Sequence, residues 1–265
     1  MTKRSVPPLK LTRSPLIFVL AQVKITPVMA VEEKIPGLQD ALRKRGFPRL
    51  VIRETEIAIE SADGQAKQTD TRRQWEFVDK ESRNSVVVDA EGITFQTTKY
   101  DMLETLMAAT RDALDLFAEH IEPDLTERIG LRYIDLVVPT DGKEIRTYFN
   151  DRLSGFSIDD DAGREAFFTE SVCKTGPNSR FIHRYVEASR GFGFPPDLLP
   201  VALKFPRDPR MQSTFGLLDM DHFMTLDEDF SVDNAIRHFF TLHEHQTKAF
   251  EASVTADALE EWKQP

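Results

Sequence analysis

Cysteine is nearly absent from this chain, since Cys173 is the only one in 265 residues. A single cysteine excludes an intramolecular disulfide and any zinc site built mainly from thiolates. Cys173 ends the alternating apolar run 167–173. This position predicts a buried, unreactive thiol rather than a nucleophile.

The glycine-rich and nucleophile motifs of common enzyme classes are also missing. The chain has no Gly-x-Gly-x-x-Gly, no P-loop and no Gly-x-Ser-x-Gly. These patterns mark dinucleotide sites, nucleoside triphosphate sites and the serine of α/β-hydrolases. We therefore expect no cofactor, and the sequence favours a protein that is not an enzyme.

An excess of positive charge and long apolar runs are lacking as well. Lys and Arg total 34 against 44 Asp and Glu, a net charge of -10, which argues against general binding to nucleic acid. The apolar run 16–23 is short and is interrupted by Gln22, whereas a membrane span needs about 18 apolar residues or more. No membrane segment or secretory signal is predicted, and we expect a cytoplasmic protein.

Alternating apolar residues dominate the remainder of the chain and predict strands. The fold class expected is α+β, with antiparallel sheets and long packed helices. Strands are predicted at 16–25, 50–59, 75–78, 85–89, 93–96, 128–138, 166–173, 180–188 and 214–223, and helices at 36–45, after 101, at 144–153 and after 231.

Three of the predicted helices carry boundary signals. Pro36 is expected near the first helical position, with Gly46 as the stop. Asp101 with Glu104 resembles a capping box that precedes a strongly periodic helix. Ser231 is expected to cap the long C-terminal helix.

The pattern of elements divides the chain into a flexible arm at 1–14 and two α+β halves at 15–127 and 128–265. Each half reads as a strand, a short helix, several strands and a long helix, so the halves are expected to resemble each other in architecture. No Gly/Ser-rich linker separates them. We expect them to share one sheet or a tight interface.

Three segments carry a family resemblance. They are the opening strand Pro15-Leu-Ile, the segment Arg128-Ile-Gly-Leu-Arg-Tyr-Ile-Asp135, and the C-terminal series that runs from Leu218-Asp-Met-Asp-His222 through Leu242-His243 to Phe250-Glu-Ala-Ser-Val-Thr255. Together they resemble a sporadically distributed bacterial and archaeal family of uncharacterised proteins of about this length. That family usually has Asn where this chain has Asp135. The resemblance implies a prokaryotic source and one shared architecture, but no activity.

The central segment predicts a cluster of arginines on one face of a strand. Alternation places Arg128, Gly130 and Arg132 on the same side, with the two arginines about 13 Å apart. Arg180 and Arg184 repeat the spacing on another strand. If the strands are neighbours, four arginines share a face. Such a face is suited to clamp a small anion or an acidic peptide, although arginines in an acidic chain also form structural ion pairs.

A weaker pattern concerns metal binding. Asp219 and Asp221 share one face of a predicted strand, while His222 points to the other face. With His243 from the last helix, the two carboxylates could hold a divalent cation. No known metal-ligand spacing is matched, so this remains the alternative.

These observations lead to three hypotheses about function. The preferred one is a cytoplasmic binding protein for a protein partner or a small acidic ligand, with Phe192 and Phe194 in an aromatic loop that either contacts a partner or folds back onto the core. A metal-assisted hydrolase or nucleic-acid-processing enzyme is the second. The third is a subunit of a larger assembly, including a homo-oligomer.

Overall fold

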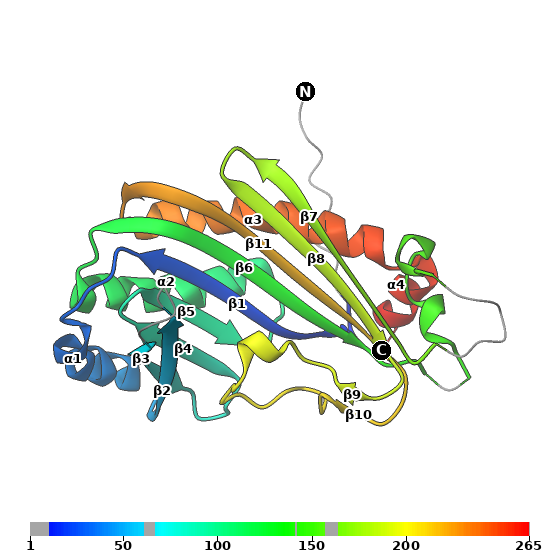
Figure 1. Cartoon of the computed structure of the whole chain (residues 1–265), viewed down its shortest axis with the longest axis horizontal. Coiled ribbons are helices and arrows are strands. Elements are labelled where there is room, and N and C mark those ends of the chain that lie inside the picture. The colour runs from blue at the N-terminus through cyan, green and yellow to red at the C-terminus, as the bar shows by residue number, and fades with distance from the viewer. Residues whose placement is uncertain (1–10, 61–66, 141, 157–163, 265) are drawn as a thin grey trace.

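The chain folds around one antiparallel sheet of nine strands (Figure 1). The structure is a computed structural model that describes residues 11–60, 67–140, 142–156 and 164–264, apart from the side chains of 55–60 and 67–71. The strand order is β2-β3-β4-β5-β1-β6-β11-β8-β7. The α+β prediction is therefore confirmed. Most of the arm expected at 1–14 lies outside the described residues.

The elements follow one another along the chain with two short strands that form a separate small sheet. The strands are β1 (Leu16–Ile25), β2 (Arg49–Glu60), β3 (Lys67–Val78), β4 (Asn84–Asp89), β5 (Gly92–Thr97), β6 (Leu125–Val137), β7 (Ala166–Gly176), β8 (Ser179–Ala188), β9 (Gly191–Phe192), β10 (Arg210–Met211) and β11 (Phe215–Asp229). The helices are α1 (Val31–Lys44), α2 (Leu103–Ile121), α3 (Val232–Ser253) and α4 (Ala256–Lys263), with 3-10 turns η1 (Ile145–Thr147), η2 (Asp151–Leu153) and η3 (Pro196–Leu198).

The long helices cover one face of the sheet, which we call the helix face (Figure 1). Val19, Ala21 and Val23 of β1 point to this face and share a core with Leu38 of α1 and Phe239 of α3. Every second residue of the strand is apolar, and the helices carry apolar residues at the helical period. The two apolar surfaces therefore face each other and are buried together. Burial of this surface is the main driving force for the fold.

The opposite side, which we call the open face, is covered by described residues only near one end. There the segment 191–211 lies over the sheet, and Phe194 and Leu203 pack against Phe18 and Ile134. Phe194 is buried, whereas Phe192 is 44% exposed. The sequence left open whether the two rings of this loop fold back onto the core or stay exposed. Phe194 folds back onto the core, and Phe192 remains partly exposed.

The strongest sequence predictions agree closely with the structure. β1 has the predicted bounds, and every residue of the periodic stripe of α2 is buried: Leu103, Leu106, Met107, Thr110, Ala113, Leu114 and Phe117. Ser231 caps α3 by accepting a hydrogen bond from the backbone N–H of Asn234. Gly46 follows α1 with a φ of 100°, the left-handed conformation that ends helices.

Two other helices start at residues that differ from the predicted ones. α1 begins at Val31, so Pro36 lies inside the helix instead of at its first position. Val31 and Ile35 are both buried, and this apolar contact extends the helix beyond its local start signal. α2 begins at Leu103, and its N-cap residue is Met102 instead of the expected Asp101.

The structure also corrects the predictions for Cys173 and for residues 144–153. Cys173 is exposed because β7 is an edge strand that lies beyond the helix layer. The segment 144–153 forms the 3-10 turns η1 and η2 instead of one helix. Only one residue of these two turns, Ile145, is buried, so no apolar stripe supports a longer helix.

The predicted halves at 15–127 and 128–265 contribute to the same sheet, and they meet where β1 pairs with β6. Similarity between the halves stays a prediction. In the described part of the chain, no helix is long and apolar enough to cross a membrane.

Neighbouring phenylalanines of α3 test the layered packing. Phe239 has no exposed surface, and Phe240 is 41% exposed. We expect Phe239→Ala to lower the free energy of unfolding by about 3–5 kcal/mol, and Phe240→Ala to change it much less. Urea denaturation measures both, and equal losses would contradict the assignment of the buried face.

Candidate functional site

The four arginines singled out in the sequence lie on the open face, although their strands are not neighbours. β11 lies between β6 and β8 and pairs with both. Phe223 of β11 is opposite Gly130 on one side and Arg180 on the other. Residues directly opposite each other in antiparallel strands point to the same face, so the alternation of each strand brings Arg128, Arg132, Arg180 and Arg184 to this face.

Arg132 lies in a buried network of ion pairs. Its Nε and Nη2 donate to the two carboxylate oxygens of Asp219 at 2.6 and 2.7 Å. Its Nη1 and Nη2 also donate to Asp197 at 2.6 and 3.2 Å. Burial lowers the pKa of Arg132, but the hydrogen bonds to Asp219 and Asp197 raise it above the ordinary value. Two carboxylates therefore occupy this guanidinium.

Arg184 extends the network to the edge of the sheet. It donates to Asp219 at 3.1 Å and to Glu170 of β7 at 2.6 Å. Burial lowers its pKa, and the hydrogen bonds to Glu170 and Asp219 raise it to a net value above normal. Arg132, Asp219, Arg184 and Glu170 thus connect β6, β11, β8 and β7 through alternating charges.

Arg128 and Arg180 are bound more loosely. Arg128 donates to the side chain of Gln22 at 2.7 Å and lies 3.7 Å from a carboxylate oxygen of Asp221. Its guanidinium is 4.3 Å from the ring centroid of Phe223, a cation–π distance. Arg180 donates to the backbone carbonyl of Ser179 at 3.1 Å. We call Arg128, Phe223 and Arg180 the open-face strip.

Gly130 has a local role in this strip. A Cβ atom at this position would lie 3.2–3.4 Å from the guanidinium of Arg128. The absence of a side chain therefore lets Arg128 fold back over its own strand toward Phe223. The space that the sequence predicted above Gly130 is filled by this arginine.

Asp221 is the carboxylate nearest to Arg128. Burial raises the pKa of Asp221, while the positive charges of Arg128 and Arg132 act against this shift. The strip holds two guanidiniums, and Asp221 beside it supplies one carboxylate. Positive side chains therefore outnumber negative ones at this place.

The alternative metal site is not assembled. Asp219 and Asp221 lie on the open face, whereas His243 is on α3 and bonds to Tyr133 on the helix face. His222 also points to the helix face, where its Nδ1 donates to the backbone carbonyl of Leu242 at 2.9 Å. Throughout the described ranges, no group of three or more His, Cys, Asp or Glu side chains is arranged to hold a metal.

A cluster of titratable side chains occupies the helix face and was not predicted. The Tyr133 hydroxyl lies 3.0 Å from Nδ1 of His243, and the ring of Tyr100 packs edge-on against Tyr133. Burial raises the pKa values of both tyrosines and lowers the pKa of His243. Burial also raises the pKa of Asp135 to about 8. At neutral pH these groups are therefore largely uncharged.

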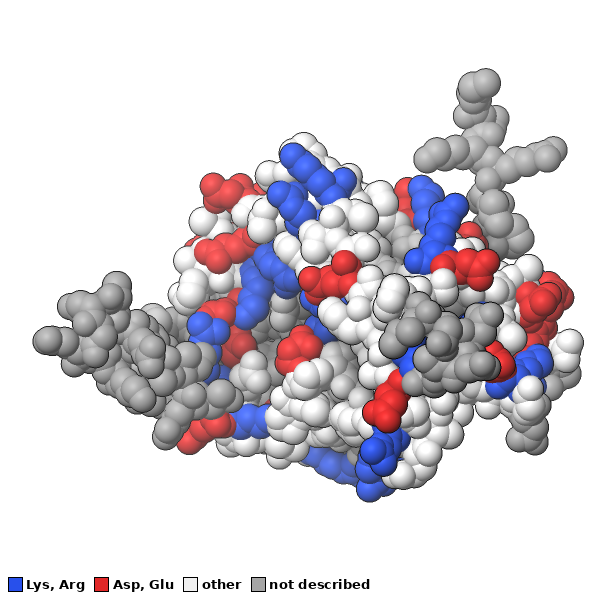
Figure 2. Space-filling model, turned by 45° about the vertical axis from the view of Figure 1, so that its right-hand side comes forward, with Lys and Arg blue, Asp and Glu red and all other residues white. Residues whose placement is uncertain are grey.

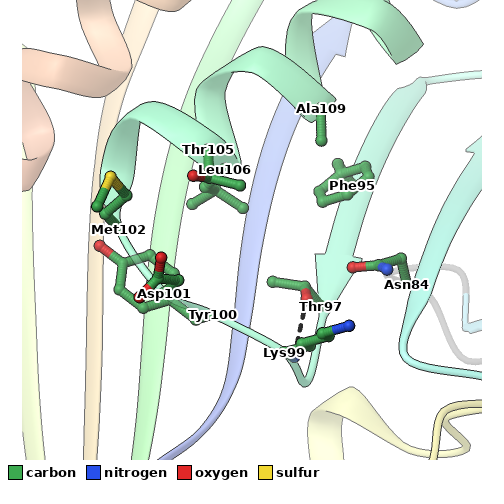
Figure 3. Close-up of a pocket in the computed structure, with 10 residues that line it drawn as sticks. All are labelled: Asn84, Phe95, Thr97, Lys99, Tyr100, Asp101, Met102, Thr105, Leu106 and Ala109. Atoms are coloured by element: carbon green, nitrogen blue, oxygen red, sulfur yellow. Dashed lines mark hydrogen bonds between the residues drawn. The ribbon is translucent and has the colours of Figure 1, made fainter. Parts of the chain in front are cut away.

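A cavity of about 50 Å³ lies beside this cluster (Figure 3). Phe95 and Ala109 lie toward one end, and Tyr100 and Asp101 lie toward the other. Such a volume holds one or a few water molecules, whereas pockets for small molecules usually measure about 300–1,000 Å³. The cavity is too small for a substrate of ordinary size.

Charges of both signs are mixed over the surface that Figure 2 displays. On the open face the ion pairs continue beyond the strip, with Lys24 bonded to Glu91 at 2.9 Å and Arg53 bonded to Glu76. In these pairs the positive side chains donate to carboxylates of the chain itself. Arg128 and Arg180 differ from them, because their hydrogen bonds go to an amide and a backbone carbonyl.

The comparisons with known proteins add no identification. No protein-family model matches the chain, and no curated protein matches it. The family resemblance drawn from the sequence motifs therefore stays a prediction.

Removal of Arg132 tests the buried network. Arg132→Ala leaves Asp219, which is 3% exposed, without its main partner. We expect the free energy of unfolding to fall by about 3–5 kcal/mol. The side chain of Asp197 is 61% exposed, so Asp197→Ala should cost less than about 1 kcal/mol. Chemical denaturation of both variants measures this difference, and similar losses would show that the pair with Asp219 is not dominant.

Asp135 predicts a dependence of stability on pH. Its pKa is about 8 in the folded chain against an ordinary 3.8, so the folded state keeps a proton that the unfolded state releases. Its contribution to stability therefore falls as pH rises from about 4 to 8, by up to about 1.4 kcal/mol per pH unit. Asp135→Asn should remove this decline. Unfolding curves at pH 5 and pH 8 test it, and identical pH dependence in the variant and the parent would refute it.

Proposed function

We propose that the chain is a binding protein that recognises an acidic segment of a protein partner at the open-face strip. One observation carries this proposal: the guanidinium of Arg128 lies over the half-buried ring of Phe223, whose cross-strand partner is Arg180, on a part of the sheet that none of the described helices covers. The strip lies next to the network around Arg132, which holds the neighbouring strands in register.

The chemistry of the strip favours carboxylate ligands. Arg128 faces one nearby carboxylate, Asp221, whose pKa is raised by burial. A guanidinium presents five N–H donors in a planar fork that matches a carboxylate. Arg128 uses one nitrogen for Gln22 and Arg180 uses one for a backbone carbonyl. Each retains donors for a ligand.

The shape of the surface favours an extended segment over a small molecule. The strip crosses three adjacent strands in a nearly straight row, because Gly130, Phe223 and Arg180 are consecutive partners across the sheet. The small cavity lies on the other side, behind the sheet. An acidic peptide laid along the row can place carboxylates at both arginines and an apolar group on Phe223.

A labelled acidic peptide provides the test. We expect fluorescence anisotropy to show binding of an octapeptide of alternating Glu and Leu, with affinity that falls as salt is added. The double variant Arg128→Ala/Arg180→Ala should bind at least about tenfold more weakly, since a hydrogen bond to a charged group contributes about 1.5–3 kcal/mol. Arg237→Ala on α3 removes one positive charge from the helix side and serves as the control for the general effect of charge.

The variant Asp221→Asn is expected to change peptide affinity in the opposite direction. Because it removes the carboxylate that competes with the peptide for Arg128, this variant should bind the peptide more tightly than the parent chain. Unchanged affinity in the double arginine variant would refute the proposal. Citrate that displaces the peptide at micromolar concentration would favour a small acidic ligand instead.

A further inference from the structure

The edge strand β7 is exposed along more than half of its length. It pairs with β8 on one side and ends the strand order on the other (Figure 1). Residues 170–174 are all exposed. Long, uncovered edge strands present unpaired backbone N–H and C=O groups, which form a template for another strand.

The side chains of β7 form a short, self-complementary pattern. Glu170, Val172 and Lys174 alternate onto the open face, because they lie opposite Arg184, Ile182 and Arg180 of β8. Val172 is 59% exposed and lies midway between one negative and one positive side chain. When a second β7 strand runs antiparallel to the first and is centred on Val172, each charged side chain lies opposite a side chain of the other sign.

We propose that two copies of the chain associate by antiparallel pairing of their β7 strands, with a two-fold axis perpendicular to the sheet at Val172. In this register Glu170 of each copy lies opposite Lys174 of the other, and the two Val172 side chains meet at the axis. The two sheets then form one continuous sheet with the helices of both copies on the same side. This C2 arrangement pairs the free backbone N–H and C=O groups of both β7 strands with each other.

The charges select this register over its neighbours. A perpendicular two-fold axis preserves the facing of every side chain, so the axis must pass through one residue. An axis at Ser171 would place Glu170 opposite Val172 and Lys174 opposite Phe168, and an axis at Glu170 would place like charges together. Opposite charges across strands stabilise by about 0.2–1 kcal/mol each, and like charges destabilise.

The small residues on the other face of β7 are compatible with close pairing. In the proposed register Ser171 lies opposite Cys173 of the second copy, and Thr169 lies opposite Thr175. None of these side chains is bulky, and both 171 and 173 are exposed. The exposure of Cys173 in the single chain leaves room for this pairing.

Charge exchange tests the interface. Sedimentation velocity of the full chain should show a dimer. Lys174→Glu and Glu170→Lys should each be monomeric at the same concentration, since both create like-charge pairs. An equimolar mixture of the two variants should recover the dimer, because each charge then meets its opposite. Lys80→Glu changes the same charge in an exposed turn between β3 and β4 and should leave the dimer intact.

Three results would overturn the proposal: a monomeric parent chain, a dimer that survives Lys174→Glu, or a mixture that fails to associate. Cross-linking checks the register independently. In a Cys173→Ser background, Val172→Cys should form a disulfide between copies on oxidation, whereas Phe168→Cys, which lies opposite Gly176, should not. Cross-linking of Phe168→Cys alone would place the axis elsewhere. Arg128 and Arg180 take no part in this interface, so loss of the dimer and loss of peptide binding are separable.

Discussion

The buried ion pair between Arg132 and Asp219 is the interaction on which the open face depends. It joins β6 to β11 near the centre of the sheet, where Asp219 is 3% exposed and Arg132 is 6% exposed. A charge removed from water is tolerated only when its partners are well placed. Arg132 meets this condition with two carboxylates. Of the four arginines predicted to share this face, Arg128 and Arg180 are the two left with donors available for a ligand.

The two faces of the sheet differ in the interactions that they carry. The helix face buries apolar surface and keeps Tyr100, Tyr133 and His243 uncharged, while the open face carries the ion-pair network around Arg132. Asp135 is an exception, because it places a carboxyl group in the buried layer. Its raised pKa makes stability depend on pH. The chain therefore carries titratable groups on both faces, in different environments.

Local patterns predicted the elements better than their arrangement. The bounds of β1 and the buried stripe of α2 follow from periodicity, and the alternation of β6 and β8 placed four arginines on one face. Strand order is set by long-range packing, so the position of β11 between β6 and β8 had no local signal. The pairing of Arg132 with Asp197 spans 65 residues and depends on the irregular segment 191–211. The cation–π contact between Phe223 and Arg128 could not be predicted either, because it depends on the strand register that places Phe223 opposite Gly130. Cys173 was expected to be buried because alternation does not distinguish an edge strand from an internal one.

The most direct test of the central claim is an NMR titration of the arginine side chains with an acidic peptide. The Nε–H resonances of Arg128 and Arg180 should shift as peptide is added, because these groups have donors to spare. The Nε–H of Arg132 donates to Asp219 at 2.6 Å and should remain nearly unchanged. Shifts confined to Arg132, or shifts in none of these resonances with a peptide that binds, would contradict recognition at the open-face strip.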